Sequence, residues 1–363
     1  MVESQNSSGH PEGLSAPIVK IGAVQWMKAN LFNGVFNSIL TLVILFFLYQ
    51  VIPPFVRWAF IDSFWMSTSE QCRAGHGACW SIIPANIRFI LFGFYPHELH
   101  WRPFAAIIML VALLLYSKNR AHWKMSLCYL WIAGLIAMGI LMRGGIFGLR
   151  GVESDQWGGL PLTLMLSVFG MVAAYPLGVL LALGRRSRMP AVKTVCVLYI
   201  ELIRGVPLIS LLFMSAVLFP LFLPAGLTVN KIIRAQAAII MFTAAYIAEV
   251  VRGGLQAITR GQYEAAESLG LNYAQKMRLV VLPQALKIVI PPSVGILISA
   301  FKDTSLVVII ALYDILKTTK SALANPLWTG FSPEAYIFVG LIYFVCCYTM
   351  SNYSRRLERE LHR

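Results

Sequence analysis

The sequence predicts an all-α polytopic membrane protein with about eight transmembrane helices. Apolar residues make up 58% of the 363 positions and charged residues only 13%, which leaves too little polar surface for a soluble domain. In addition, several apolar runs reach the length of about 20 residues that a helix needs to cross ~30 Å of hydrocarbon. Both observations indicate a chain that spends most of its length inside a bilayer.

The spans follow from the apolar runs in chain order. We expect them near residues 35–56, 104–117, 126–142, 160–183, 195–223, 235–251, 288–313 and 335–353. The second run is short and extends to Trp101 if its helix begins earlier. Pro207, Pro220, Pro291 and Pro292 predict kinks or helix boundaries, because proline lacks the amide hydrogen that a helix interior needs. Counts of seven or nine spans therefore stay open beside eight.

The distribution of basic residues predicts the orientation. The short connections around Lys118 and Arg185 contain basic residues without acidic ones, which is typical of cytoplasmic loops. The connection between them carries balanced charges, as expected on the outer side. Eight spans with both termini in the cytoplasm agree with these assignments, and Lys231 and Arg234 run against them. The net charge of +14 is thus mostly explained by topology, and no basic stripe interleaved with aromatic residues predicts nucleic-acid binding.

The polar residues 1–34 precede the first span. Val24, Met27 and Leu31 recur at near-helical spacing, which favours an interfacial helix on the inner leaflet, with a disordered tail as the alternative. The apolar run that follows lacks a small-residue cleavage pattern, so we interpret it as an uncleaved first span.

The loop 57–102 is expected outside and contains Cys72 and Cys79. In an oxidising compartment this pair predicts a disulfide that closes a small loop. A metal site is the alternative, with His76 between the two cysteines, but no second pair of ligands repeats the spacing. The other four cysteines lie in or beside apolar runs and are interpreted as packing residues.

A polar, amphipathic segment at residues 260–283, RGQYEAAESLGLNYAQKMRLVVLP, separates two apolar runs. Glu264 and Glu267 are expected in the first turns of a helix, where carboxylates interact favourably with the positive end of the helix dipole. Ala265 and Ala266 would let a partner approach the backbone closely. Gly270 suits the left-handed residue that ends a helix.

A second short helix is expected to follow this glycine. Asn272 and Gln275 have the spacing of a capping box, and Pro283 is expected to stop the helix. Residues 260–283, which we call the elbow, are thus predicted to form two short helices joined at a sharp bend. Its motif residues are Glu264, Ala265, Ala266, Ser268, Leu269, Gly270, Leu282 and Pro283.

This motif resembles the signature loop of the membrane subunits of ATP-binding-cassette (ABC) importers. From about residue 158 to the C-terminus, segments that begin at Glu201, Ala248 and Phe301 resemble the polar amino-acid branch of these permeases. The segments CRAGHGACW and FGFYPHELHWRP, which lie before residue 158, resemble the longer of two permeases in the general L-amino-acid importers of Gram-negative bacteria.

The resemblance implies a domain organisation, a function and partners. It implies a cytoplasmic segment 1–34, an additional membrane region 35–157, a type I ABC importer core 158–354 in which five helices line a path, and a cytoplasmic tail 355–363. The implied function is import of polar L-amino acids across the bacterial inner membrane. The implied partners are a related permease in a heterodimer, two ATPase subunits whose grooves receive the elbow, and a periplasmic amino-acid-binding protein.

The chain contains no phosphate-binding G-x-x-x-x-G-K-[ST] motif, so we expect it to bind no cofactor and to rely on ATP used by its partners. Ion coupling is the alternative source of energy, but an ion-coupled transporter is expected to have mirrored hydrophobic halves and intramembrane carboxylates, and the halves here do not mirror each other. No metal cluster, nucleophile elbow or pair of catalytic acids predicts a membrane enzyme.

Two sets of charged residues near or inside the spans are candidates for a role in transport. Glu201 with Arg204, and Glu249 with Arg252, have the i, i+3 spacing of ion pairs near cytoplasmic helix ends. These pairs either anchor and pack the helix ends or take part in gating.

Lys302 and Asp303 lie about 15 Å beyond Pro292 along a helix, near the middle of the bilayer, where ionisable groups commonly mark a substrate path. Together with the hydroxyls of Thr304 and Ser305 they could match a zwitterionic amino acid. The alternative is a Lys302–Asp303 pair that joins helices.

Overall fold

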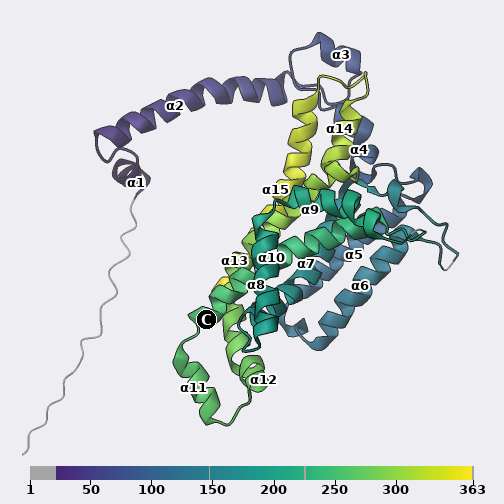
Figure 1. Cartoon of the computed structure of the whole chain (residues 1–363). Coiled ribbons are helices and arrows are strands. Elements are labelled where there is room, and N and C mark those ends of the chain that lie inside the picture. The colour runs from purple at the N-terminus through teal and green to yellow at the C-terminus, as the bar shows by residue number, and fades with distance from the viewer. Residues whose placement is uncertain (1–21, 147, 225, 362–363) are drawn as a thin grey trace, which may run out of the picture. The chain divides into compact units, whose positions relative to one another are not determined.

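A computed structural model describes residues 22–146, 148–224 and 226–361, and these residues are mostly helical. The helices are α1 Ala23–Asn30, α2 Val35–Val56, α3 Ser69–Ala74, α4 Ile82–Phe92, α5 Trp101–Ser117, α6 Met125–Arg143, α7 Gly159–Arg185, α8 Pro190–Gly205, α9 Leu208–Phe213, α10 Lys231–Ala257, α11 Arg260–Ser268, α12 Tyr273–Lys276, α13 Leu282–Asp303, α14 Ile315–Leu323 and α15 Ser332–Leu361 (Figure 1). Shorter 3-10 and π turns connect several of them, and the two-residue strand β1 is Tyr313–Asp314.

The described chain divides into two compact units. The first ends at Ser63 and also includes residues 75–78, and the second comprises residues 64–74 and everything from Cys79 onward. The first unit contains α1 and α2, and α2 continues into a π turn at Arg57–Ile61. The side chains of α2 are apolar on all faces and largely exposed, which is the pattern of a helix that meets lipid. The expectations for residues 1–21 concern a segment outside the described residues.

Seven helices of the described residues are long and apolar enough to cross a membrane, or eight if one bent pair is counted as a span. The bent pair is Pro190–Gly205 with Leu208–Phe222, whose axes turn by 104°. The run at residues 195–223 is therefore not a single straight helix, and the kink expected at Pro207 is a sharp bend between two helices. Val206 is extended, with φ −110° and ψ 134°, because the residue before a proline is pushed out of the helical region, and α9 begins directly after Pro207.

Helices α7 and α10 form the centre of the second unit. Small residues line their contact: Ala174, Gly178 and Ala182 on α7 are buried, as are Ala244 and Ala248 on α10. A methyl group added at Gly178 would lie 2.9 Å from the carbonyl oxygen of Ala244. The two backbones therefore approach closely, as small residues allow helices to do in membranes.

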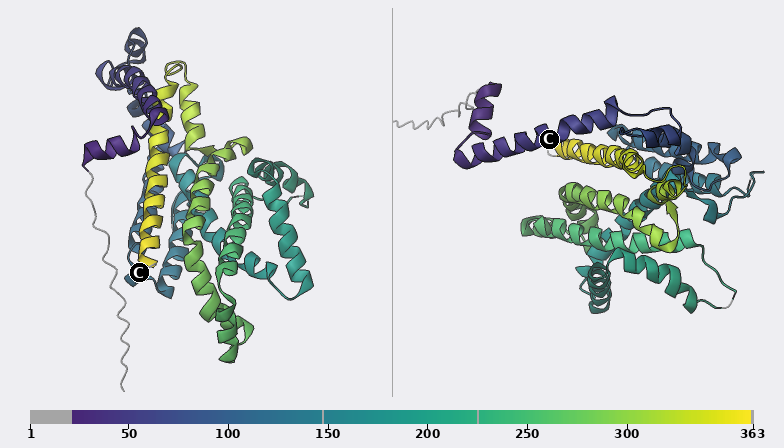
Figure 2. Two further views of the ribbon diagram at one scale, coloured as in Figure 1. Left: turned by 90° about the vertical axis from the view of Figure 1, so that its left-hand side faces the viewer. Right: turned by 90° about the horizontal axis from the view of Figure 1, so that it is seen from above.

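The elbow helices α11 and α12 lie at one end of the second unit, and α4 and α14 lie at the other (Figures 1 and 2). Arg234, one of the two basic residues that opposed the topology, lies in the first turn of α10, at the end remote from the elbow. Its guanidinium donates to the carbonyl oxygen of Ala216, which lies within the π turn at Met214–Leu218. Its charge is thus held by backbone oxygens, which accounts for a basic residue on this side.

Candidate coupling elbow and transport path

The first elbow helix, α11, begins after Thr259 and ends at Ser268. Glu264 is its fifth residue and so lies within the first two turns as expected, whereas Glu267 lies in its last turn, so the expectation was wrong for Glu267. Lys276 compensates instead: its ammonium group pairs with the Glu267 carboxylate. This hydrogen bond, and then the nearby charge of Lys276, hold the pKa of Glu267 below its ordinary value. The pair ties the end of α11 to α12.

The bend between the two elbow helices is held by backbone hydrogen bonds. Gly270 has φ +72°, which is the left-handed conformation expected of it. Its amide donates to the Glu267 carbonyl oxygen at 2.9 Å, and the Leu271 amide donates to that of Ala266 at 3.2 Å. These two bonds satisfy carbonyl groups that the end of α11 leaves free. The turn therefore has a defined geometry rather than being a flexible link.

The second elbow helix has the predicted capping box. The Asn272 side chain accepts from the Gln275 amide at 2.9 Å, and the Gln275 side chain accepts from the Asn272 amide at 3.0 Å. Pro283, however, does not stop this helix. A π turn at Met277–Val281 joins α12 to α13, so helical structure runs from Tyr273 to Ile310. The wider turn tolerates Pro283, which lacks the amide hydrogen of an α-helical residue.

The elbow buries one side and exposes the other. Ala266, Met277 and Val281 are buried, and the last two belong to an apolar cluster with residues of α10 and α13. Leu269 is 79% exposed and Tyr273 is 56% exposed. The motif residues Glu264, Ala265, Ser268 and Gly270 are exposed as well, whereas Leu282 is partly buried and Pro283 is exposed. A small-residue, partly apolar surface is thus presented at this end of the second unit.

A network of five charged side chains connects α7, α8 and α10 beside the elbow. Glu249 on α10 lies at its centre: its carboxylate pairs with Arg252, lies 3.3 Å from Arg185 and lies 3.7 Å from Arg204. Arg185 also pairs with Glu201 at 2.9 Å. The predicted i, i+3 pair forms between Glu249 and Arg252. Glu201 and Arg204 instead form ion pairs with other helices, so that the network joins three helices.

Asp303 lines a cavity of about 400 Å³ between α9, α10 and α13. The lining also includes Thr243, Tyr246 and Ser299, and the remaining lining residues are apolar or glycine. Lys302 is exposed and does not line this cavity. Thr304 is buried, with its hydroxyl donating to the Phe301 carbonyl, and Ser305 donates to the Lys302 carbonyl. The four candidates therefore do not converge, and among the described residues no ion pair joins Lys302 to Asp303.

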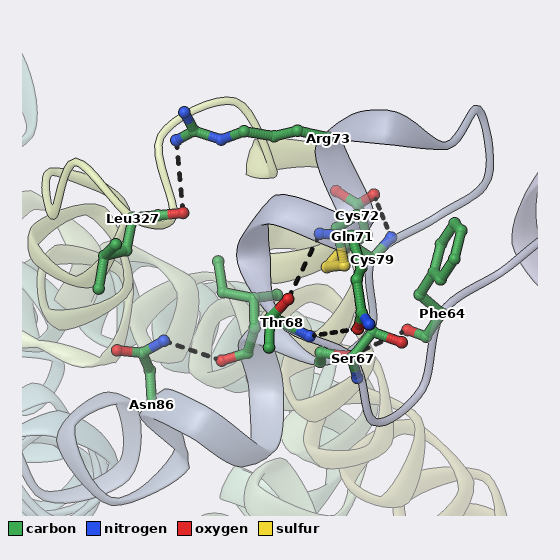
Figure 3. The surroundings of a disulfide bond; sticks show 12 residues. Phe64, Ser67, Thr68, Gln71, Cys72, Arg73, Cys79, Asn86 and Leu327 are labelled. Atoms are coloured by element: carbon green, nitrogen blue, oxygen red, sulfur yellow. Dashed lines mark hydrogen bonds between the residues drawn. A yellow bond between two sulfur atoms is a disulfide. The ribbon is translucent and has the colours of Figure 1, made fainter.

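At the other end of the second unit, a disulfide joins Cys72 to Cys79, with 5.6 Å between their Cα atoms (Figure 3). The Cys79 amide donates to the buried carboxylate of Glu334 at 2.9 Å. In Figure 3 the Arg73 guanidinium points to the carbonyl oxygen of Leu327. The disulfide segment is thus bonded to the region around the start of α15. Within the described ranges, no group of three or more His, Cys, Asp or Glu side chains could hold a metal ion.

Sequence reasoning missed the partners of several side chains in and beside the elbow. Arg185 and the adjacent Arg186 were interpreted only as a topology signal, and no partner was expected for Lys276 or Tyr263. Arg185 contacts Glu249, and Arg186 contacts Tyr263, across separations of 64 and 77 residues. No local spacing can reveal such contacts. The lack of acidic residues near Arg185 and Arg186 was a signal of cytoplasmic location only.

Comparisons with known proteins agree with this architecture. Residues 174–363 match the family described as "Binding-protein-dependent transport system inner membrane component". The chain is 45% identical to an inner membrane amino-acid ABC transporter permease, YhdY of Escherichia coli, with 94% of this chain and 93% of the relative covered. It is 37% identical to BztC of Rhodobacter capsulatus, a glutamate/glutamine/aspartate/asparagine transport system permease, with 96% of each chain covered.

A solved structure supports the fold of the C-terminal part. A chain in the crystal structure of an amino acid ABC transporter with histidines is 32% identical and superposes with a TM-score of 0.50, covering 56% of this chain and 92% of that chain. The family match, the two nearly full-length relatives and the apolar helices point to the same class of protein. The chain therefore belongs to the family of binding-protein-dependent transport system inner membrane components, the permease subunits of ABC transporters.

Proposed function

We propose that this chain is the translocating permease subunit of an ATP-driven importer of polar L-amino acids in the bacterial inner membrane. The observation that carries the mechanism is the elbow: a turn fixed by backbone bonds, exposed at its tip and continuous with α13. A rigid projection of this kind can transmit work from a partner to the membrane helices. The amino-acid substrate class is supported by the names of the two nearly full-length relatives.

The proposed partners follow from this role. Two ATPase subunits would receive the elbow in surface grooves and supply the energy of ATP hydrolysis, and a periplasmic binding protein would deliver the amino acid at the outer face. A related second permease would complete a heterodimer. Both termini and the elbow would lie in the cytoplasm, and the disulfide between Cys72 and Cys79 would lie in the oxidising periplasm, where such bonds persist.

The cavity beside Asp303 is the proposed site of passage through this subunit. A carboxylate that faces a mostly apolar cavity inside a span can hold the ammonium group of an amino acid, and groups of this kind are retained in membranes for function. Thr243 and Ser299 add hydroxyl groups to the same cavity. Lys302 lies on an exposed face and therefore has no assigned role in the passage.

Substitutions in the elbow test the coupling role. Gly270→Pro would remove the amide donor and force φ from +72° to about −65°, and Glu264→Lys would reverse a charge at the exposed tip. We expect both variants to insert normally and to lose uptake of radiolabelled L-glutamine in cells that lack their own importer. Glu70→Lys makes the same charge change on an exposed residue of α3, outside the elbow, and should retain uptake. Normal transport by both elbow variants would contradict the coupling role.

The source of energy separates this proposal from ion-coupled transport. Proteoliposomes that contain the complex purified from its native membrane should take up L-glutamine when ATP and the co-purifying ATPase are present. The uptake should persist when ionophores collapse the ion gradients. Uptake that needs a gradient and ignores ATP would favour the ion-coupled alternative.

A further inference from the structure

The side chain of Arg186 joins three parts of the chain at the base of the elbow. Arg186 directly follows α7, and its Nη1 atom donates to the carbonyl oxygen of Leu255 at 2.9 Å and to the Tyr263 hydroxyl at 3.0 Å. The Tyr263 hydroxyl donates to the same Leu255 oxygen at 3.1 Å. Leu255 lies in the last turn of α10, where carbonyl groups lack a helical partner. One guanidinium therefore connects the ends of α7, α10 and α11.

The ring of Tyr263 is also bound to the second elbow helix. The guanidinium carbon of Arg186 lies 5.6 Å from the ring centroid, and the Lys276 ammonium lies 6.0 Å from it. Both distances are in the range of cation–π attraction. Lys276 is buried and pairs with Glu267, so the ring is linked to both elbow helices as well as to the helical body.

The two elbow helices are attached to the helical body in different ways. Met277 and Val281, which follow α12, share an apolar cluster with residues of α7, α10 and α13. In α11, by contrast, Ala266 is the one buried residue, and Tyr263 is partly buried against this cluster. The Gln284 side-chain amide donates to Gln262 at 2.9 Å, and the Arg186 guanidinium joins Tyr263 to the Leu255 carbonyl group. Polar contacts thus contribute much of the attachment of α11.

We propose that Arg186 is a positioning residue that fixes the orientation of the first elbow helix, α11, against the ends of α7 and α10. The inference rests on the proposed coupling function of the elbow. When a partner displaces the exposed tip of the elbow, Arg186 transfers the displacement of α11 to the closely packed pair α7 and α10 through Tyr263 and the Leu255 carbonyl group. Without this side chain α11 changes its orientation independently of α7 and α10, and cycles of hydrolysis occur that move no substrate.

The decisive measurement is the number of amino-acid molecules transported per ATP hydrolysed. The complex purified from its native membrane would be placed in proteoliposomes, and L-glutamine uptake and phosphate release would be measured on the same sample. Arg186→Ala is expected to lower this ratio about tenfold, because it removes two hydrogen bonds from a charged donor. Tyr263→Phe keeps the ring but removes the hydroxyl, and should lower the ratio less. Arg186→Lys keeps the charge without the planar fork and should not restore the wild-type ratio.

The controls distinguish this role from a purely structural one. A variant that is merely less stable loses uptake and hydrolysis together, so its ratio of transported amino acids to hydrolysed ATP stays at the wild-type value. A wild-type ratio for Arg186→Ala would therefore overturn the proposal. Lys193→Ala removes an exposed basic side chain close to the same connection and should leave the ratio unchanged. If Arg186→Ala fails to assemble, Tyr263→Phe and Arg186→Lys decide by the same criterion. Wild-type complex without ATP-dependent uptake would instead contradict the proposed function itself.

Discussion

Removal of the Glu249 carboxylate should destabilise the second unit, because three arginines depend on it. In the wild type, Arg185, Arg204 and Arg252 face Glu249 and Glu201, three positive charges against two negative ones. Glu249→Gln leaves three against one. At an effective dielectric constant of about 20, a charge pair separated by some 3 to 4 Å is worth roughly 4 to 5 kcal/mol before desolvation is subtracted.

The net effect is smaller, because the charges are partly hydrated. The side chain of Glu249 is 24% exposed, so we place the cost of Glu249→Gln at about 2–3 kcal/mol, below the 3–5 kcal/mol typical of a fully buried broken pair. Removal of one arginine as well should offset part of this loss in the free energy of unfolding. The double variant Glu249→Gln/Arg252→Gln restores an excess of one positive charge, and we expect it to recover about 1 kcal/mol relative to Glu249→Gln.

The assay is the thermal midpoint of the purified, detergent-solubilised chain, followed by the loss of monodisperse protein on heating. Glu249→Gln should lower the midpoint by about 5 °C, and the double variant should lie between it and the wild type. Glu70→Gln removes an exposed carboxylate and serves as the matched control. A Glu249→Gln midpoint equal to that of the control, or a double variant less stable than both single variants, would refute the electrostatic reasoning.

Two further predictions use the same measurement. Gly254→Leu should destabilise the chain by about 2–3 kcal/mol, because an added Cβ would overlap the Val289 side chain and lie 3.0 Å from the Ala285 carbonyl oxygen. Gly253→Leu is the control, since a Cβ at Gly253 meets nothing within 4 Å. Equal thermal midpoints for the two variants would argue against close packing of α10 on α13. Burial raises the pKa of the Asp314 carboxyl from 3.8 to about 6, so between these pH values the folded chain binds more protons than the unfolded chain, and its stability should fall as the pH rises. Asp314→Asn keeps an acceptor for the Leu316 and Lys317 amides and should flatten this pH dependence of the thermal midpoint. A pH profile that is unchanged in this variant would contradict the assignment.

The features that sequence reasoning predicted correctly depend on local pattern. Six of the eight expected runs lie within single observed α-helices, because membrane thickness sets the minimum length of an apolar run. The capping box at Asn272 and Gln275 and the left-handed Gly270 were predicted because each depends on residues within a few positions of itself. The family motif was found for the same reason, since its residues are close in the chain.

The features that were missed depend on contacts between distant segments or on irregular helical turns. The π turn at Met277–Val281 has no clear local signature, so Pro283 was interpreted as a stop. The bend after Gly205 was expected only as a kink at Pro207. Glu201 was paired with its neighbour Arg204, whereas Arg185 on α7 is its observed partner. An i, i+3 spacing makes a pair geometrically feasible, but packing decides which cation lies nearer.

The helical run from Tyr273 to Ile310 has a mechanical consequence. Its 38 residues form a lever that carries the elbow at one end and Asp303 near the other, without a loop between them. Pro291 and Pro292 lie within it and leave the carbonyl groups of Lys287 and Ile288 without their helical donors, so the lever bends most easily at that level. Under the proposed function, these prolines would act as a hinge: a displacement of the arm that carries the elbow would change the angle of the arm that borders the cavity.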